Sequence, residues 1–335
     1  MAEISQPLSG ESLISSDFLD FIREGGKFII AGHIEPDGDC VGSQLALASV
    51  LRRMGKQAIP CSAGPFKRPE IKPYEHFFTA APSEQDRDGA RVIVVDCSAP
   101  DRTGDLEPFL QGLPTAVIDH HSNAAGVQGL GYVDVHALST TFLVFNLIGA
   151  LGLTPFKEEA ELLLLGLCTD TGFFRHIDES GAETFQAAAA LIRSGASPKA
   201  AFAAMYGGKS LDSRRLIAHI LLRAESLFDG KLILSSEEYE ETCRFGLEGR
   251  DSDTLYQLLQ SVAGVQAIVI IRQESPENCT VGFRSRDQID VARIAQSFGG
   301  GGHKNAAGLY IKGTIAELKP KIIQAFAAVF GGEQP

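Results

Sequence analysis

The sequence contains no apolar run of the roughly 18 residues that a membrane-spanning helix requires. Its first residues, MAEISQPLSGESL, lack the basic and apolar segments of a signal peptide. The six cysteines are widely spread and form no CxxC pair, which argues against a disulfide framework and against a zinc ribbon. We therefore expect a cytoplasmic protein that does not associate with membranes.

Positive charge is also scarce. The chain has 30 Lys and Arg against 42 Asp and Glu, which gives a formal net charge of −12. Long duplex nucleic acid is held mainly by cationic side chains that neutralise many phosphates, so this composition opposes that partner. A few arginines and bound metal ions can still hold a small anion, and we expect a short RNA or a small nucleotide as substrate. The oligomeric state stays open, with a homodimer as one possibility.

A length of 335 residues with 44% hydrophobic residues predicts two domains. In the first half, strand-like and helix-like patterns alternate, which indicates an α/β fold with a mostly parallel sheet flanked by helices. Strands are predicted at residues 27–31, 57–60, 91–95 and 115–118, and helices at residues 41–54, 140–150, 157–167 and 183–194. In such sheets, ligands collect beyond the carboxyl ends of the strands.

The second half predicts a smaller α/β domain. Residues 1–195 form the first domain in this interpretation, residues 196–228 a helical linker, and residues 229–335 the second domain. Strands are predicted there at residues 231–235, 265–272, 280–284 and 309–312, and helices at residues 252–262, 291–297 and 315–330.

Carboxylate and imidazole side chains gather in four short segments, GHIEPDGD, VVDCS, IDHH and CTDTG. Three of these segments close a strand-like run, so their side chains can meet at one sheet edge. Several carboxylates packed together would repel one another, whereas divalent cations would keep them ionised. The pattern predicts a metal-dependent hydrolase with these site residues: His33, Asp37, Asp39, Asp96, Asp119, His120 and Asp170.

The spacing in HIEPDGD places His33, Asp37 and Asp39 on one tight loop, which can serve two ions. Asp96 is predicted to bridge the ions, because a carboxylate has two oxygens and hydrolytic two-metal sites hold their ions ~3.5–4 Å apart. Such a pair of ions activates water and polarises phosphoryl oxygens.

His120 and Asp170 are predicted to complete the shell of the second ion. Mixed imidazole and carboxylate ligands favour Mn²⁺ over Mg²⁺, and zinc or cobalt would also fit. His121 is predicted to donate a hydrogen bond to the phosphate or the leaving oxygen. Asp119 is predicted to orient a metal-binding imidazole, as carboxylates often do.

A second informative stretch begins with four glycines, residues 299–302, followed by His303, Lys304 and Asn305. Backbone N–H groups of such a loop can approach an anion without obstruction, so we predict a phosphate or nucleotide cradle. Arg284 and Ser285 are predicted to add contacts to the substrate. Arg175 either grips a phosphate through a bidentate contact or is a solvated arginine without that role.

Taken together, GHIEPDGDCVGS, VVDCS, IDHHSN and CTDTGFFRH resemble the four motifs of the DHH phosphoesterase superfamily, and GGGGHKNAAG resembles the signature of its DHHA1 domain. The resemblance extends from about residue 27 to about residue 308 and points to the short nanoRNase A type, which is similar to RecJ. It implies a first Mn²⁺ held by His33, Asp37 and Asp96, and a second held by Asp39, Asp96, His120 and Asp170. It also implies substrate contacts from Arg284, Ser285, Gly301, Gly302 and His303.

The activity implied by the resemblance is hydrolysis of very short oligoribonucleotides to mononucleotides, together with dephosphorylation of 3′-phosphoadenosine 5′-phosphate (pAp). Hydrolysis of signalling dinucleotides such as c-di-AMP or pApA is an alternative that no residue excludes. A nucleotide-binding regulator without catalysis is a further alternative, which the intact set of metal-ligand types opposes. Inorganic pyrophosphatase is opposed by the GGGGHKNAAG segment, because pyrophosphate needs no nucleoside-binding domain.

Overall fold

The computed structural model describes residues 14–98, 100–121, 129–286 and 289–331. It divides into two compact units, Met1–Gly208 and Lys209–Pro335. None of the described helices is long and apolar enough to cross a membrane. The division falls inside the stretch that we predicted as a linker: helix α8 (Pro198–Tyr206) packs on α6 (Lys157–Asp170), and α9 (Leu211–Leu222) packs on a strand of the second unit.

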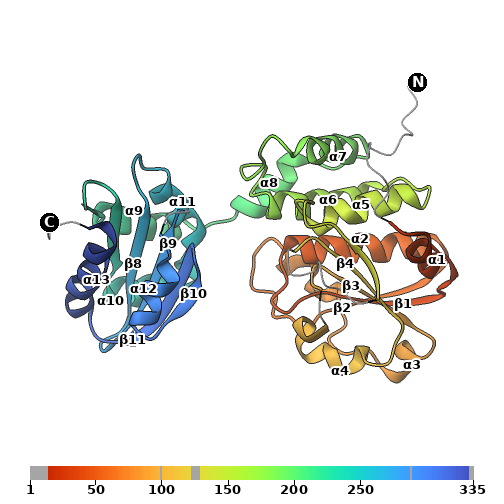
Figure 1. Ribbon diagram of the computed structural model, residues 1–335, viewed down its shortest axis with the longest axis horizontal. Helices are drawn as coiled ribbons and strands as arrows, with labels where there is room; N and C mark the ends of the chain where they lie inside the picture. The colour runs from red at the N-terminus through yellow and green to blue at the C-terminus, as the bar shows by residue number, and fades with distance from the viewer. Residues whose placement is uncertain (1–13, 99, 122–128, 287–288, 332–335) are drawn as a thin grey trace. The chain divides into compact units, whose positions relative to one another are not determined.

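The first unit is built on a five-stranded parallel sheet with the order β2-β1-β3-β4-β5 (Figure 1). Its strands are β1 (Lys27–Ala31), β2 (Gln57–Cys61), β3 (Arg91–Val95), β4 (Thr115–Asp119) and β5 (Leu130–Val133). The remaining helices of this unit are α1 (Ser16–Glu24), α2 (Gly38–Arg53), α3 (Glu84–Arg87), α4 (Glu107–Leu110), α5 (Thr140–Ala150) and α7 (Ala182–Arg193), with 3₁₀ turns at Lys72–Phe77 and Pro100–Leu106. The α/β prediction with a parallel sheet is confirmed.

Both faces of this sheet are buried, because successive side chains of a strand point to opposite sides. On β1, Phe28 and Ile30 join the core with α1, α2, α5 and α6, while Ile29 and Ala31 join a second core with α4. Figure 1 shows the corresponding layers, with α2, α5 and α6 on one side of the sheet and α3 and α4 on the other. The buried strands explain the continuous apolar runs in the sequence.

The second unit has a six-stranded mixed sheet with the order β10-β11-β9-β8-β7-β6, in which only the β7–β8 pair is parallel among the described strands. Its strands are β6 (Glu225–Leu227), β7 (Leu232–Glu237), β8 (Ala267–Ser275), β9 (Asn278–Ser285), β10 (Gly301–His303) and β11 (Ala306–Lys312). Besides α9, its helices are α10 (Tyr239–Phe245), α11 (Ser252–Gln260), α12 (Val291–Ser297) and α13 (Ile315–Phe330), with a 3₁₀ turn at Leu247–Gly249.

The glycine run differs from the loop that the sequence predicts. Residues 301–303 form β10, which pairs with β11 in a hairpin that turns at Lys304 and Asn305. A Cβ on Gly302 would lie 2.5 Å from the Ala306 oxygen, so the absence of a side chain allows the two backbones to approach closely. The glycines therefore serve strand pairing as well as leaving an open backbone edge.

Candidate metal centre

The predicted metal-binding side chains lie at the carboxyl edge of the central strands. His33 follows β1, Asp96 follows β3 directly, and Asp119 is the last residue of β4. These three strands are neighbours in the sheet, so their ends bring the side chains to one place. Asp170, the last residue of α6, joins them from the helical layer.

Asp96 lies at the middle of this cluster. Its Oδ2 is 3.3 Å from Nε2 of His33, and its Oδ1 is 3.6 Å from Nε2 of His120. Thr140 donates a hydrogen bond from Oγ1 to the same Oδ1 at 3.0 Å. The carboxylate is almost fully buried, at 3% exposure, and its backbone adopts a φ of 60°. Strained backbone of this kind is tolerated where the surrounding structure fixes it, and often at functional sites.

His120 presents an unsatisfied nitrogen to the cluster. Its Nδ1 lies 3.1 Å from the carbonyl oxygen of Ala137, which can only accept, so Nδ1 carries a proton. Nε2 is buried and makes no hydrogen bond of good geometry with any described residue, although Oδ2 of Asp170 is 3.1 Å away. A lone pair that faces a carboxylate oxygen at this distance needs a proton or a cation between them.

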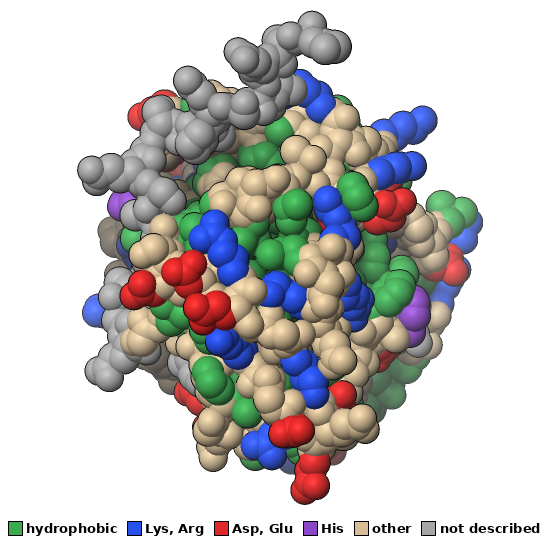
Figure 2. All heavy atoms as spheres, turned by 90° about the vertical axis from the view of Figure 1, so that its right-hand side faces the viewer, with side chains coloured by type: hydrophobic (Ala, Val, Ile, Leu, Met, Phe, Trp, Pro, Cys, Tyr) green, Lys and Arg blue, Asp and Glu red, His purple; other side chains and the backbone are tan. Residues whose placement is uncertain are grey.

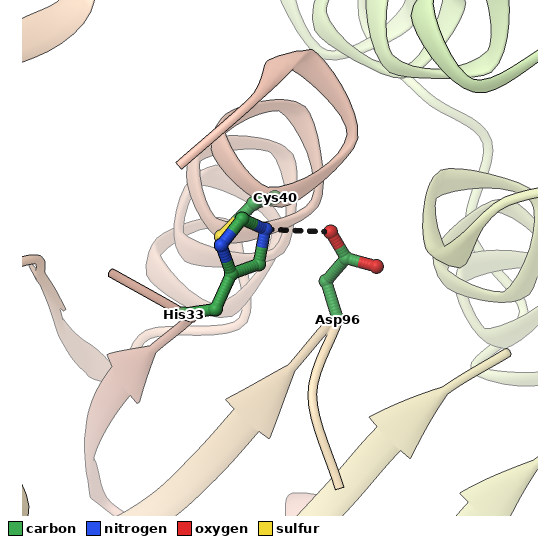
Figure 3. A group of neighbouring side chains, drawn as sticks. All are labelled: His33, Cys40 and Asp96. Atoms are coloured by element: carbon green, nitrogen blue, oxygen red, sulfur yellow. Dashed lines mark ion pairs between the residues drawn. The ribbon is translucent and has the colours of Figure 1, made fainter. Parts of the chain in front are cut away.

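His33 faces Asp96 from the other side (Figure 3). Its Nδ1 lies 2.8 Å from the carbonyl oxygen of Ile34, which leaves Nε2 directed at Asp96. The Sγ of Cys40 belongs to the same group of ligand atoms, which lie within 4.8 Å of one another. Burial, followed by the charges of Asp96 and Asp37, raises the pKa of this thiol, which donates to Oε1 of Gln44 at 3.5 Å. The side chain of Cys40 is fully buried and packs against Gln44.

Asp37 and Asp39 lie at the start of α2, which begins three residues before the predicted helix. Oδ1 of Asp37 caps the helix by accepting from the backbone N–H groups of Asp39 and Cys40, at 3.0 and 3.1 Å. The same oxygen is 4.0 Å from Nε2 of His33. Asp39 is therefore in the first helical turn rather than on the loop that the spacing suggests.

Asp39 is fully buried and is held by the start of another helix, α5. Its Oδ1 accepts from the backbone N–H and from Oγ1 of Thr141, at 2.8 and 2.6 Å, and its Oδ2 accepts from the backbone N–H of Thr140. Oδ2 is also 3.9 Å from Nε2 of His120. Thr140 and Thr141 were not among the predicted site residues, and the only signal for them is their place at the start of a predicted helix.

The pKa values of four groups in the cluster are raised, those of Asp39, Asp96, His33 and His120. Burial raises the pKa of Asp39 and Asp96, and neighbouring carboxylates raise both further. Burial lowers the pKa of His33, but the contact with Asp96 raises it to about 9. Burial likewise lowers that of His120, while Asp170, Asp39 and Asp96 raise it to about 10. The cluster thus has an excess of negative charge, which either protons or divalent cations can neutralise.

His121 is oriented by Asp119. Oδ1 of Asp119 accepts from Nδ1 of His121 at 2.8 Å and from its backbone N–H at 3.2 Å. This contact raises the pKa of His121, while partial burial lowers it. The His121 side chain is half exposed, whereas Asp119 is buried. The imidazole that Asp119 contacts is therefore that of His121 and not that of His120.

The residues predicted to contact the substrate lie on two different units. Arg175 is exposed in the first unit and donates from Nε to the Gly172 oxygen at 2.8 Å. In the second unit, the ends of β9, β10 and β11 bring together the others: Arg284, Ser285, Gly301, Gly302, His303 and Asn305. The guanidinium of Arg284 lies 4.6 Å from the ring centroid of Tyr256, and Ser285 donates from Oγ to the Ile289 oxygen at 2.7 Å.

Comparison with known proteins agrees with this architecture. The model of the DHH family N-terminal domain matches residues 27–167, and that of the DHHA1 domain matches residues 232–332. Over 290 residues, the chain is 32% identical to the bifunctional oligoribonuclease and PAP phosphatase NrnA of Thermus thermophilus. The aligned region covers 86% of this chain and 85% of NrnA. The chain belongs to the DHH family of phosphoesterases.

Two further similarities bear on the fold and on the substrate. The chain is 26% identical over 345 residues to the cyclic-di-AMP phosphodiesterase PdeA of Listeria monocytogenes, and it spans 50% of the length of that protein. A crystal structure of an exopolyphosphatase-related protein from Bacteroides fragilis has a TM-score of 0.79 at 24% identity and covers 94% of this chain and 96% of that one. The protein is a hydrolase of the DHH type with the family's two-domain fold.

Proposed function

We propose that this protein hydrolyses oligoribonucleotides of a few residues to mononucleotides and dephosphorylates pAp, with the help of two divalent cations. The observation that carries the proposal is the position of Asp96. Its two oxygens face imidazole nitrogens on opposite sides, at 3.3 and 3.6 Å. A carboxylate in that position is suited to bridge two ions. The similarity to the Thermus NrnA supports the choice of substrate.

The donor set fits two ions. His33, Asp37 and Asp96 would hold the first, and Asp39, Asp96, His120 and Asp170 would hold the second. The unsatisfied Nε2 of His120 and the buried Asp39 are the features that most need a cation. Mixed nitrogen and oxygen donors favour Mn²⁺, while Mg²⁺ and Co²⁺ are further options. When bound, the ions supply Lewis acidity for hydrolysis at neutral pH.

The other residues position and protonate the substrate. Thr140 and Thr141 hold Asp96 and Asp39 in place through the hydrogen bonds described above. His121 donates a hydrogen bond to the phosphate or the leaving oxygen, because Asp119 fixes its Nδ1 and favours its protonated form. Arg175 and the β9–β11 edge of the second unit, with Arg284, Ser285, Gly301, Gly302, His303 and Asn305, bind the phosphate and the terminal nucleotide.

A direct assay tests the proposal. The purified protein is incubated with Mn²⁺ and either an end-labelled RNA trimer or pAp, and products are separated by chromatography. We expect mononucleotides from the trimer and AMP from pAp, and no product with excess EDTA. Absence of both products at micromolar protein in Mn²⁺, Mg²⁺ and Co²⁺ would disprove the proposal. A long RNA duplex is the matched negative substrate, because the charge of −12 opposes its binding.

A second substrate class is favoured by the similarity to PdeA, which is named a cyclic-di-AMP phosphodiesterase. The same metal cluster can attack the phosphodiester of a cyclic or linear dinucleotide. Rates on pAp, RNA trimer, pApA and c-di-AMP, measured side by side with one preparation, separate the two possibilities. A kcat/KM for c-di-AMP above that for the trimer would favour the second class.

A further inference from the structure

Five aromatic rings form a continuous row on the first unit, which we call the aromatic row: Phe185, Phe174, Phe173, Phe202 and Tyr206. Ring centroids of successive members lie 5.2, 5.6, 5.1 and 4.8 Å apart in that order. Phe185 and Phe202 are each 51% exposed, although large apolar side chains usually avoid water. A connected row of partly exposed rings is more than the scattered apolar residues of an ordinary surface.

The turn after α6 holds the second and third rings of the row in place at an energetic cost. Phe173 and Phe174 have φ values of 57° and 69°, a region that bulky residues rarely adopt. The backbone N–H of Phe173 donates to the Cys168 oxygen at 2.6 Å, and that of Phe174 donates to Oγ1 of the buried Thr171 at 3.1 Å. Strain of this kind persists where function requires a defined geometry.

The middle ring of the aromatic row lies close along the chain to the metal cluster. Phe173 is three residues after Asp170, whose Oδ2 is 3.1 Å from Nε2 of His120. The guanidinium of Arg175 is held over the same turn by its bond to the Gly172 oxygen, and it can meet a phosphate there. A phosphodiester at the cluster would therefore lie near the turn that carries two of the rings and one cation.

We propose that the aromatic row is a stacking platform for the bases of a single-stranded oligoribonucleotide whose scissile phosphate lies at the metal cluster. This inference rests on the proposed function. A chain with a net charge of −12 has few cations with which to neutralise the phosphates beyond the cleaved one. Base stacking on neutral rings supplies affinity without charge and tolerates any sequence. The row thus extends the site beyond a single nucleotide and favours oligomers over mononucleotide substrates.

The test compares binding of oligomers of different length. Binding is measured by fluorescence anisotropy of fluorescein-labelled RNA dimers and pentamers in Mn²⁺, in full-length Asp96→Ala protein, which should hydrolyse the RNA too slowly to shorten it during the measurement. Adding Phe185→Ala or Phe202→Ala should raise the Kd for the pentamer about tenfold, corresponding to ~1.4 kcal/mol, and should affect the dimer less. In otherwise unchanged protein, the same substitutions should raise KM for the pentamer more than they lower kcat.

Four comparisons make the result specific. Phe185→Tyr should retain the affinity, while Phe185→Leu, which keeps an apolar side chain without a ring, should lose it. Phe77→Ala is the matched control, because Phe77 is 55% exposed but belongs to a different part of the unit. A pentamer with abasic residues should bind the parent protein more weakly and should no longer distinguish it from Phe185→Ala.

The outcomes separate this inference from the proposed function. Release of mononucleotides by the unmodified protein, together with unchanged pentamer affinity in the Phe185 and Phe202 variants, would overturn the platform and leave the activity intact. Length-dependent loss of binding in those variants supports the platform even if no product is released. A change in sedimentation of these variants without a change in RNA affinity would show that the row joins two copies of the chain, and would overturn the inference.

Discussion

Asp96 connects the two histidines of the cluster, because its two carboxylate oxygens face His33 and His120, and Thr140 donates to one of them. The sequence predicted this position from an aspartate directly after an apolar strand. What the sequence could not supply is the left-handed backbone at Asp96, which aims the carboxylate across the ends of two strands. Such a conformation depends on the surrounding contacts and leaves no local pattern.

The first prediction concerns the different proposed roles of Asp96 in catalysis and of His303 in substrate binding. Asp96→Ala should lower kcat by on the order of a thousandfold, because it removes the group that both ions share. His303→Ala should raise KM about tenfold and leave kcat within a fewfold of its original value. Steady-state kinetics on pAp measure both effects. If both variants changed only KM, the bridging role of Asp96 would be wrong.

The N-termini of helices α2 and α5 meet at Asp39. Asp39 is in the first turn of α2, and the first N–H groups of α5 donate to its carboxylate. Helix N-termini carry partial positive charge, so they stabilise a buried anion that would otherwise be costly. The two helices thus position the carboxylate of Asp39 between them.

The second prediction tests this support. Thr141→Val removes the hydroxyl that donates to Asp39 at 2.6 Å and keeps the side-chain shape. It should lower the free energy of unfolding of the first unit by about 1–3 kcal/mol, because a buried charged acceptor loses a partner. Urea denaturation followed by circular dichroism measures the change. Thr115→Val is the matched control, since its hydroxyl donates only to the Leu113 backbone oxygen at the rim of the sheet. An equal loss in both variants would contradict the special role of Thr141.

Elements with strong local patterns agree between sequence and structure. The predicted bounds of β1, β3, α5, α12 and α13 match the structure, because continuous apolar strands and helices with clear capping residues are encoded locally. The sequence did not predict β5, with its central Gly131, or the short hairpin strand β10. Glycine is a poor strand former, so neither segment has a strand-like pattern, although β10 pairs with β11 across a two-residue turn. The contact of Thr141 with Asp39 joins residues 102 positions apart and left no local signal.

The charge balance of the cluster makes a third prediction, for the molecule as a whole. Without metal, the folded protein holds protons on His33 up to a pKa of about 9 and on His120 up to about 10, whereas unfolded histidine releases them near 6.5. The stabilisation of the folded state by these protons is fully present below pH 6.5. It is lost as the pH rises from 6.5 through the folded-state pKa values of His33 and His120. The raised pKa values of Asp39 and Asp96 also make the metal-free folded state less stable as the pH rises.

In EDTA, the melting temperature of the first unit should therefore fall between pH 6.5 and pH 8.5, by about 5 °C, for a loss on the order of 2 kcal/mol. Differential scanning calorimetry measures this change. Mn²⁺ should reverse it and raise the melting temperature most at pH 8.5, where protons compete least for the imidazoles. His33→Asn should reduce the pH dependence. A metal-free protein that becomes more stable from pH 6.5 to pH 8.5 would contradict the charge balance.

His33 and Asp170 lie far apart along the chain, and this separation affects the order of events in folding. During synthesis, the strands that carry the early donors emerge long before α6, and parallel strands must wait for their crossovers before they pair. Under the proposed ligand set, metal binding should therefore be among the last events of folding in this unit, since Asp170 is absent from the cluster until α6 has been made and docked. Uptake of Mn²⁺ by a freshly diluted, refolding chain should then report completion of the native topology, and a fragment that stops short of α6 should bind less metal than the full chain.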